Sequence, residues 1–131
     1  MIPMIEAMMI PGGPKPGGPY SHVVRAGDFL FVSGQIPRNP DTQEFEFTGI
    51  ERQTTLVLEN IRRILEGCGA SPADVVRCNV FLSDPSDFNA MNEVYSAFFG
   101  GHKPARTTVG VSFVRPEMKI EIDCIAYRPQ A

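Results

Sequence analysis

Cysteine and histidine are scarce in this sequence of 131 residues, and their scarcity excludes several kinds of site. Cys68, Cys78 and Cys124 are the three cysteines, an odd number without close spacing, which argues against a disulfide framework or a zinc knuckle and favours a reducing, cytoplasmic location. The two histidines, His22 and His102, are far apart, so the sequence indicates neither a His-rich metal site nor a Ser-His-Asp arrangement.

Positive charge and long apolar runs are also lacking. Twelve Lys and Arg residues against fifteen Asp and Glu residues give a net charge of −3, which argues against binding to the phosphate backbone of nucleic acids. Residues 1–10 are apolar, but they contain Glu6 and proline and have neither a basic start nor the length of a membrane span. We therefore expect no signal peptide and no membrane helix. An anionic ligand would need a local Arg or Lys.

The overall composition is that of a globular protein, with 43% hydrophobic and 21% charged residues. A chain of this length matches the usual size of one domain, and it buries enough surface to fold without disulfides or metals. We therefore expect residues 1–131 to form a single domain.

Proline and glycine are concentrated between Pro11 and Pro19, where Lys15 alone is neither. This composition excludes a helix and the interior of a sheet, so it predicts a loop. An ordered loop would deliver Tyr20 to a fixed place, and a flexible tether is the alternative.

Runs rich in β-branched and aromatic residues predict several strands. Residues 23–26 and 29–33 are separated by a Gly-Asp pair and indicate an antiparallel hairpin. Residues 107–114 and 119–127 are separated by an Arg-Pro-Glu sequence that predicts a turn between them. The full set of expected strands is 23–26, 29–33, a short one near 44–47, 76–82, 107–114 and 119–127.

Two amphipathic stretches predict helices. The first begins at a capping box, Thr48-Gly-Ile-Glu51, and ends before Gly69. After a brief capped turn at residues 71–74, the second begins at Asp84-Pro85 and ends at Gly100-Gly101. The side chains expected to face the core are Val57, Leu58, Ile61, Ile64, Leu65 and Cys68 in the first helix and Phe88, Met91, Val94, Tyr95, Phe98 and Phe99 in the second.

The order of these elements, strand-strand-(strand)-helix-strand-helix-strand-strand, predicts an α+β fold. Its two β-α-β passages favour right-handed crossovers and one mixed sheet with both helices packed on a single face. The other face would keep apolar side chains such as Phe81 and Ile125 without a cover, so we expect a homo-oligomer.

A small set of residues could form a binding site: Tyr20, Ser33-Gly34, Asn92, Arg106 and Glu121. Arg106 has no acidic residue near it in the sequence and could bind a carboxylate ligand; a surface arginine is the alternative. Glu121 alternates with isoleucines, a pattern that by itself indicates an exposed residue of a strand. If the last two strands pair as a simple hairpin, Arg106 and Glu121 lie roughly 20 Å apart. A site that uses both must then combine different chains or a different strand pairing, and we expect a cleft between subunits.

Six motifs between Gly18 and Tyr127 resemble, in order and spacing, the reactive-intermediate deaminase (Rid, YjgF-like or endoribonuclease L-PSP) family. They are GPYSH, DFLFVSGQIP, ILEGCGASPADVV, FLSD-x-x-DF-x-x-MNEVYSAFF, KPARTTV and KIEIDCIAY. The resemblance implies a chorismate-mutase-like fold, a homotrimer with ligand clefts between subunits, and hydrolysis of enamines or imines to keto acids and ammonia. It implies no cofactor and no metal.

The resemblance also implies roles for individual residues. Arg106 matches the arginine that binds the substrate carboxylate, and Glu121 matches the glutamate that orients the attacking water. Gly34 matches a backbone contact beside the carboxylate, next to Ser33, and Tyr20 and Asn92 match positions in the pocket wall.

Two positions depart from the commonest family pattern. Thr108 stands where many members carry cysteine, so a thiol role is absent, and PARTTV resembles the branch that acts on 2-aminomuconate. His22 stands where glutamine is common. The leading hypothesis is a deaminase for small carboxylated substrates such as 2-aminoacrylate. The alternatives are a 2-aminomuconate-type deaminase, an endoribonuclease or translation inhibitor, and a non-catalytic keto-acid-binding protein.

Overall fold

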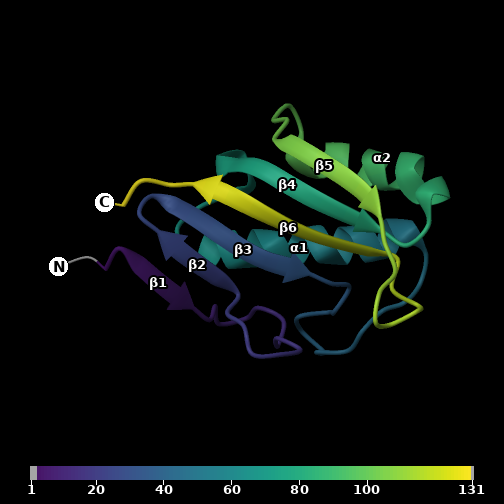
Figure 1. Ribbon diagram of the computed structural model, residues 1–131, viewed down its shortest axis with the longest axis horizontal. Helices are drawn as coiled ribbons and strands as arrows, with labels where there is room; N and C mark the ends of the chain where they lie inside the picture. Colours follow the sequence, from purple (N-terminus) through teal and green to yellow (C-terminus); the bar gives the residue numbers. More distant parts are fainter. Residues whose placement is uncertain (1–2, 131) are drawn as a thin grey trace.

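The computed structural model describes residues 3–130 and has an α+β architecture, with one mixed sheet and two helices (Figure 1). The six strands follow the spatial order β1-β2-β3-β6-β4-β5, and β4 and β5 are the parallel pair. The elements are β1 (Ile5–Met8), β2 (Val23–Ala26), β3 (Phe29–Gln35), α1 (Ile50–Gly67), β4 (Val75–Leu82), α2 (Phe88–Phe99), β5 (Ala105–Gly110) and β6 (Ile120–Tyr127).

Both helices cover the same face of the sheet, as predicted, and the apolar core lies between the two layers (Figure 1). The predicted stripe of α1 is buried except for Cys68, which is half-buried. In α2, Met91, Tyr95 and Phe99 are buried, but Phe88 is 40% exposed because it lies in the first turn, beyond the edge of the core. The predicted capped turn before β4 is also present, since Asp74 accepts a hydrogen bond from the Ser71 amide.

The prediction that the last two strands form a hairpin is wrong. β4 lies between β5 and β6, pairing with β5 in parallel and with β6 antiparallel. The α2 crossover returns the chain beside β4 on its outer edge, and the long connection at residues 111–119 then carries it back across the end of the sheet. β6 is central because one of its faces, from Ile120 to Ala126, is fully apolar and buried.

Other local expectations also need correction. Residues 44–47 form no strand, and their part in the pairing is one isolated bridge between Arg38 and Phe45. α1 begins at Ile50 with Gly49 as its N-cap and no side-chain cap bond, so the predicted capping box is not formed. The apolar start of the chain contains an edge strand, β1, which the sequence analysis missed.

The second face of the sheet has no helix over it. Several large apolar side chains on it are about two-fifths exposed, including Phe29, Phe31, Val109 and Tyr127. Phe81 and Ile125, which the sequence analysis placed on this face, are half-buried. We call this surface the open face. No helix within residues 3–130 is long and apolar enough to cross a membrane.

Candidate functional site

Strand geometry places Arg106 and Glu121 on opposite faces of the sheet. Arg106 is paired with Cys78, whose side chain is buried on the helix face, and its guanidinium carbon lies 4.8 Å from the Tyr95 ring centroid of α2. Glu121 alternates with the buried Ile120 and Ile122 and therefore points to the open face. The two residues belong to two half-sites, which one chain does not bring together.

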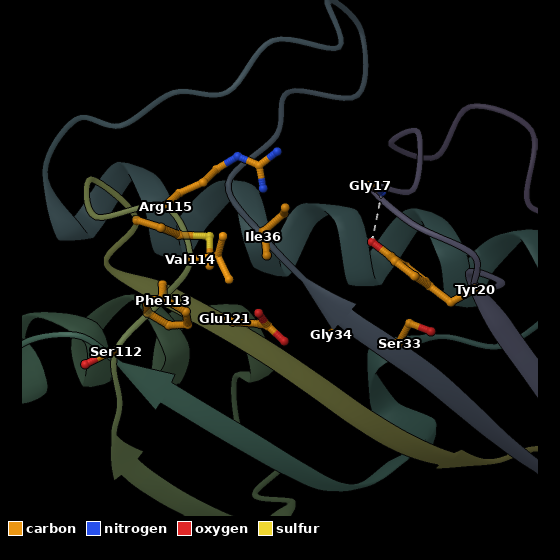
Figure 2. A pocket seen from close by; sticks show the side chains of 11 residues that line it. Gly17, Tyr20, Ser33, Gly34, Ile36, Ser112, Phe113, Val114, Arg115 and Glu121 are labelled. Carbon is orange, nitrogen blue, oxygen red and sulfur yellow. Dashed lines mark hydrogen bonds between the residues drawn. The ribbon is translucent and has the colours of Figure 1, made fainter.

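The half-site on the open face, which we call the acid half-site, contains Tyr20, Ser33, Gly34 and Glu121. These residues line one cavity of about 520 Å³ at the end of β3 and the start of β6 (Figure 2). A Cβ at Gly34 would overlap the Glu121 carboxylate in its present position, so glycine permits this close approach and a larger residue would displace the carboxylate. A bulge between Val32 and Gln35 interrupts the β3–β6 pairing at the same place.

The Pro-Gly loop is ordered, as expected, and holds Tyr20 at the edge of this cavity. The Tyr20 hydroxyl accepts a hydrogen bond of 3.1 Å from the Gly17 amide (Figure 2). Behind the loop, buried His22 accepts a 2.8 Å bond at Nδ1 from the Ile10 amide, and its Nε2 lies 2.5 Å from the Pro14 carbonyl oxygen. Because one nitrogen accepts and the other donates, these two contacts fix a neutral imidazole with its proton on Nε2.

Glu121 has the electrostatics of a potential base. Burial raises the pKa of its carboxyl above the ordinary value, and the neighbouring charge of Asp123 raises it further. Within residues 3–130 no hydrogen bond or ion pair engages this carboxylate, whereas Asp123 accepts a bond from Asn79. A desolvated carboxylate with a raised pKa can orient water and accept its proton.

The second half-site, on the helix face, contains Asn92, Arg106 and Thr108; we call it the arginine half-site. Arg106 and Asn92 line a cavity of about 340 Å³, and Thr108 lines a neighbouring one of about 460 Å³. Phe88 borders the second cavity, and the centroid of its ring lies 5.7 Å from the Arg106 guanidinium carbon.

Arg106 is half-buried, and none of the ion pairs within residues 3–130 involves it. The Thr108 hydroxyl oxygen is buried and has no hydrogen-bond partner in the same part of the chain. Aromatic stacking therefore holds a cation whose donors are free, next to an unsatisfied hydroxyl. This arrangement suits the binding of a planar anion such as a carboxylate.

The cysteines near Arg106 are unsuited to nucleophilic catalysis. Burial raises the pKa of Cys78 to about 11 and raises the pKa of Cys124 well above its ordinary value. All three cysteines are free thiols. Neither buried thiol, Cys78 or Cys124, is therefore available as a thiolate near neutral pH.

Three basic side chains in the cavities that hold Arg106 and Glu121 were not predicted from the sequence as site residues. His102 and Lys103 line the same cavity as Arg106, and Arg115 lines the same cavity as Glu121. The position of Lys103 in KPARTTV was a usable signal, because it lies three residues before Arg106. Arg115 gave no such signal, because it was assigned to a hairpin turn that does not exist.

The family model described as endoribonuclease L-PSP matches residues 12–128. The chain belongs to the reactive-intermediate deaminase (YjgF-like, endoribonuclease L-PSP) family. A RutC family protein of Pyrococcus horikoshii is 49% identical over 95% of this chain and 99% of its own length. A 2-iminobutanoate/2-iminopropanoate deaminase of Dermatophagoides farinae is 37% identical over 88% of this chain and 90% of its own.

Solved structures of the reactive-intermediate deaminase family share the fold. The crystal structure of Escherichia coli TdcF with bound serine superposes with a TM-score of 0.85 at 37% identity, covering 92% of this chain and 98% of that chain. The predicted architecture, a mixed sheet with two helices on one face, is therefore confirmed.

Proposed function

We propose that this protein hydrolyses small carboxylated enamines and imines, such as 2-aminoacrylate and its imine tautomer, to a keto acid and ammonia. The observation that carries the proposal is the guanidinium of Arg106, which forms no ion pair within residues 3–130 and stacks on Tyr95 in the cavity that it lines with Asn92. Relatives that are named deaminases support the same reaction class.

The reaction needs a carboxylate clamp and an oriented water. Arg106 donates two parallel hydrogen bonds to the substrate carboxylate, and Thr108 and Asn92 offer further polar contacts. With the imine nitrogen protonated from solvent, Glu121 accepts a proton from water as the water oxygen bonds to the imine carbon and the C=N π pair moves to nitrogen, which gives a neutral carbinolamine. The protonated Glu121 then passes its proton to the amine nitrogen, and as the hydroxyl proton leaves and the C=O bond forms, the C–N bond breaks, releasing ammonia and leaving the keto acid. Positioning supplies much of the rate gain, because a protonated imine reacts readily with water.

We further propose that the protein is a homotrimer with its active sites between subunits. Because Arg106 and Glu121 lie on opposite faces, both can meet one substrate when the acid half-site of one copy adjoins the arginine half-site of another. The apolar side chains of the open face, Phe29, Phe31, Val109 and Tyr127, supply the surface for that contact.

The test measures keto-acid and ammonia release from imines made in place by an amino-acid oxidase, or from 2-aminoacrylate made by a dehydratase. Arg106→Ala is expected to lower kcat/KM about a hundredfold, because it removes a charged two-bond contact. Arg106→Lys keeps the positive charge but cannot donate two parallel hydrogen bonds, so its kcat/KM should lie between those of the wild type and Arg106→Ala. Arg62→Ala is the matched control, because that guanidinium also stacks on a phenylalanine, Phe98, but on the helix surface.

Two results would contradict the proposal: no acceleration by the wild type, or an Arg106→Ala variant as active as Arg62→Ala. The same assay tests the alternative that the PARTTV motif suggests, a 2-aminomuconate-type deaminase, when 2-aminomuconate is compared directly with 2-aminoacrylate. Tight binding of a keto acid without turnover would instead indicate a non-catalytic binding protein. Arg106-dependent cleavage of RNA by stringently purified protein would indicate the endoribonuclease alternative.

A further inference from the structure

A second arginine lines the cavity that holds Glu121. Arg115 lies in the connection between β5 and β6 and lines the acid half-site with Tyr20 and Gly34 (Figure 2). Its guanidinium carbon lies 4.3 Å from the centroid of the Phe45 ring. Neither the steps of the proposed deaminase reaction nor the packing of the core uses this side chain.

The Phe45 ring beneath Arg115 makes further contacts of its own. Phe45 stacks on Phe47 with ring planes only 10° apart, and the Arg38 guanidinium carbon lies 4.8 Å from the same Phe45 ring. Arg38 is itself fixed, since it donates to the carbonyl oxygens of Gln43 at 2.8 Å and Lys15 at 3.0 Å. The proline that follows Arg115 restricts the backbone conformation of the arginine. These contacts favour one position of the cation at the cavity rim and so lower the conformational entropy that it loses on binding.

The charge of Arg115 is not neutralised by the acidic residues of the neighbouring loop. Glu46 is bound by Arg52 at 3.0 Å, and Asp41 is bound by Arg63 at 3.2 Å. Arg115 takes part in no ion pair within residues 3–130, and Glu121 is the one acidic side chain among the described residues that line the cavity. Arg38 and Arg115 approach the same ring, so their like charges add to a positive potential at this rim.

We propose that Arg115 recognises a second carboxylate, so that the enzyme accepts 2-imino acids whose side chain ends in a carboxylate. This inference rests on the proposed deaminase function. Arg106 of one subunit would hold the carboxylate next to the imine carbon, Glu121 of the neighbour would face that carbon with its water, and Arg115 would hold the far end. The cavity of about 520 Å³ is within the range of small-molecule sites and leaves room for such a substrate.

The test compares two imines of similar length, one from glutamate by glutamate oxidase and one from methionine by an L-amino-acid oxidase. Arg115→Met keeps the length of the side chain and removes its charge. It should lower kcat/KM for the glutamate imine about fivefold to tenfold and leave the methionine imine unchanged. Arg115→Lys should retain part of the preference. Arg62→Met, the same change at another stacked arginine, should alter neither rate.

Ionic strength gives an independent readout. Because Arg115 is exposed, added salt should screen its attraction and lower the rate for the glutamate imine more steeply than the rate for the methionine imine. In Arg115→Met the two salt dependences should coincide.

Three other outcomes would contradict the specificity role of Arg115, the substrate class or the deaminase function. If Arg115→Met lowers both rates equally, or neither, Arg115 does not determine specificity. If the wild type hydrolyses the methionine imine but not the glutamate imine, the substrate class is wrong while the deaminase function stands. If neither imine is hydrolysed, the deaminase function fails, and this inference fails with it.

Discussion

At the scale of single residues, the acid half-site holds a carboxylate in an unfavourable state. Glu121 is partly desolvated and unpaired in the described chain, and its raised pKa records the cost of its charge. Gly34 leaves room for the carboxylate, which a larger residue would displace. Stability is therefore given up at the position where the proposed reaction needs a base.

Glu121→Gln should separate stability from activity. Because the pKa of Glu121 is raised in the folded state, the folded protein favours the protonated carboxyl. The contribution of Glu121 to stability is therefore fully present below its unfolded-state pKa and is lost as the pH rises through its folded-state pKa. At pH 7 the glutamine variant should therefore be more stable than the wild type, and the difference should vanish toward acid pH. Denaturant unfolding from pH 4 to 8 measures this, and kcat should fall about a hundredfold in the same variant. Equal stability at every pH would show that the carboxylate is not strained.

Only some residues of the acid half-site could be predicted from the sequence. Tyr20, Ser33, Gly34 and Glu121 were named as site candidates and line one cavity. Arg115 was not predicted, because its place at the cavity depends on contacts with segments distant in the sequence, which no local pattern indicates.

At the scale of elements, the local patterns were informative and the long-range pairings were not. α1, α2 and the β2–β3 hairpin were predicted because helical periodicity and a two-residue turn are encoded within a few residues. The partner of β6 depends on where two crossovers place β4 and β5, so the simplest hairpin was the wrong choice. β1 was missed because an edge strand with mostly exposed residues shows no buried alternation.

The His22 imidazole holds the Pro-Gly loop at Ile10 and Pro14, and its contribution can be tested by substitution. His22→Ala leaves the Ile10 amide and the Pro14 carbonyl without partners, so it should cost about 1–3 kcal/mol in the free energy of unfolding. Because Tyr20 then loses its fixed position, KM should also rise. His22→Gln can accept at one atom and donate at the other, so it should restore most of both quantities. Thermal unfolding and steady-state kinetics measure the effects, and equal behaviour of the two variants would exclude this role for the loop.

At the scale of the whole molecule, the two half-sites make the proposed trimer testable by mixing. Arg106→Ala and Glu121→Gln should each keep only about a hundredth of the wild-type activity alone, and so be close to inactive. After unfolding and refolding together in equal amounts, they should regain roughly a quarter of the wild-type activity, because random assembly gives one site in four an intact arginine and an intact glutamate.

The control for this mixing experiment is each variant refolded alone, which should stay inactive. Analytical ultracentrifugation of the mixture should show trimers. No recovery in properly assembled mixtures would mean that Arg106 and Glu121 do not share a site across subunits.

The pleat that turns Arg106 and Glu121 away from each other also governs how the rate responds to dilution. A lone subunit of such an assembly would hold substrate without converting it, so turnover per chain would decline once the concentration drops below the level needed for association. The amount of protein in the cell would then regulate the reaction more steeply than in direct proportion, with no effector required.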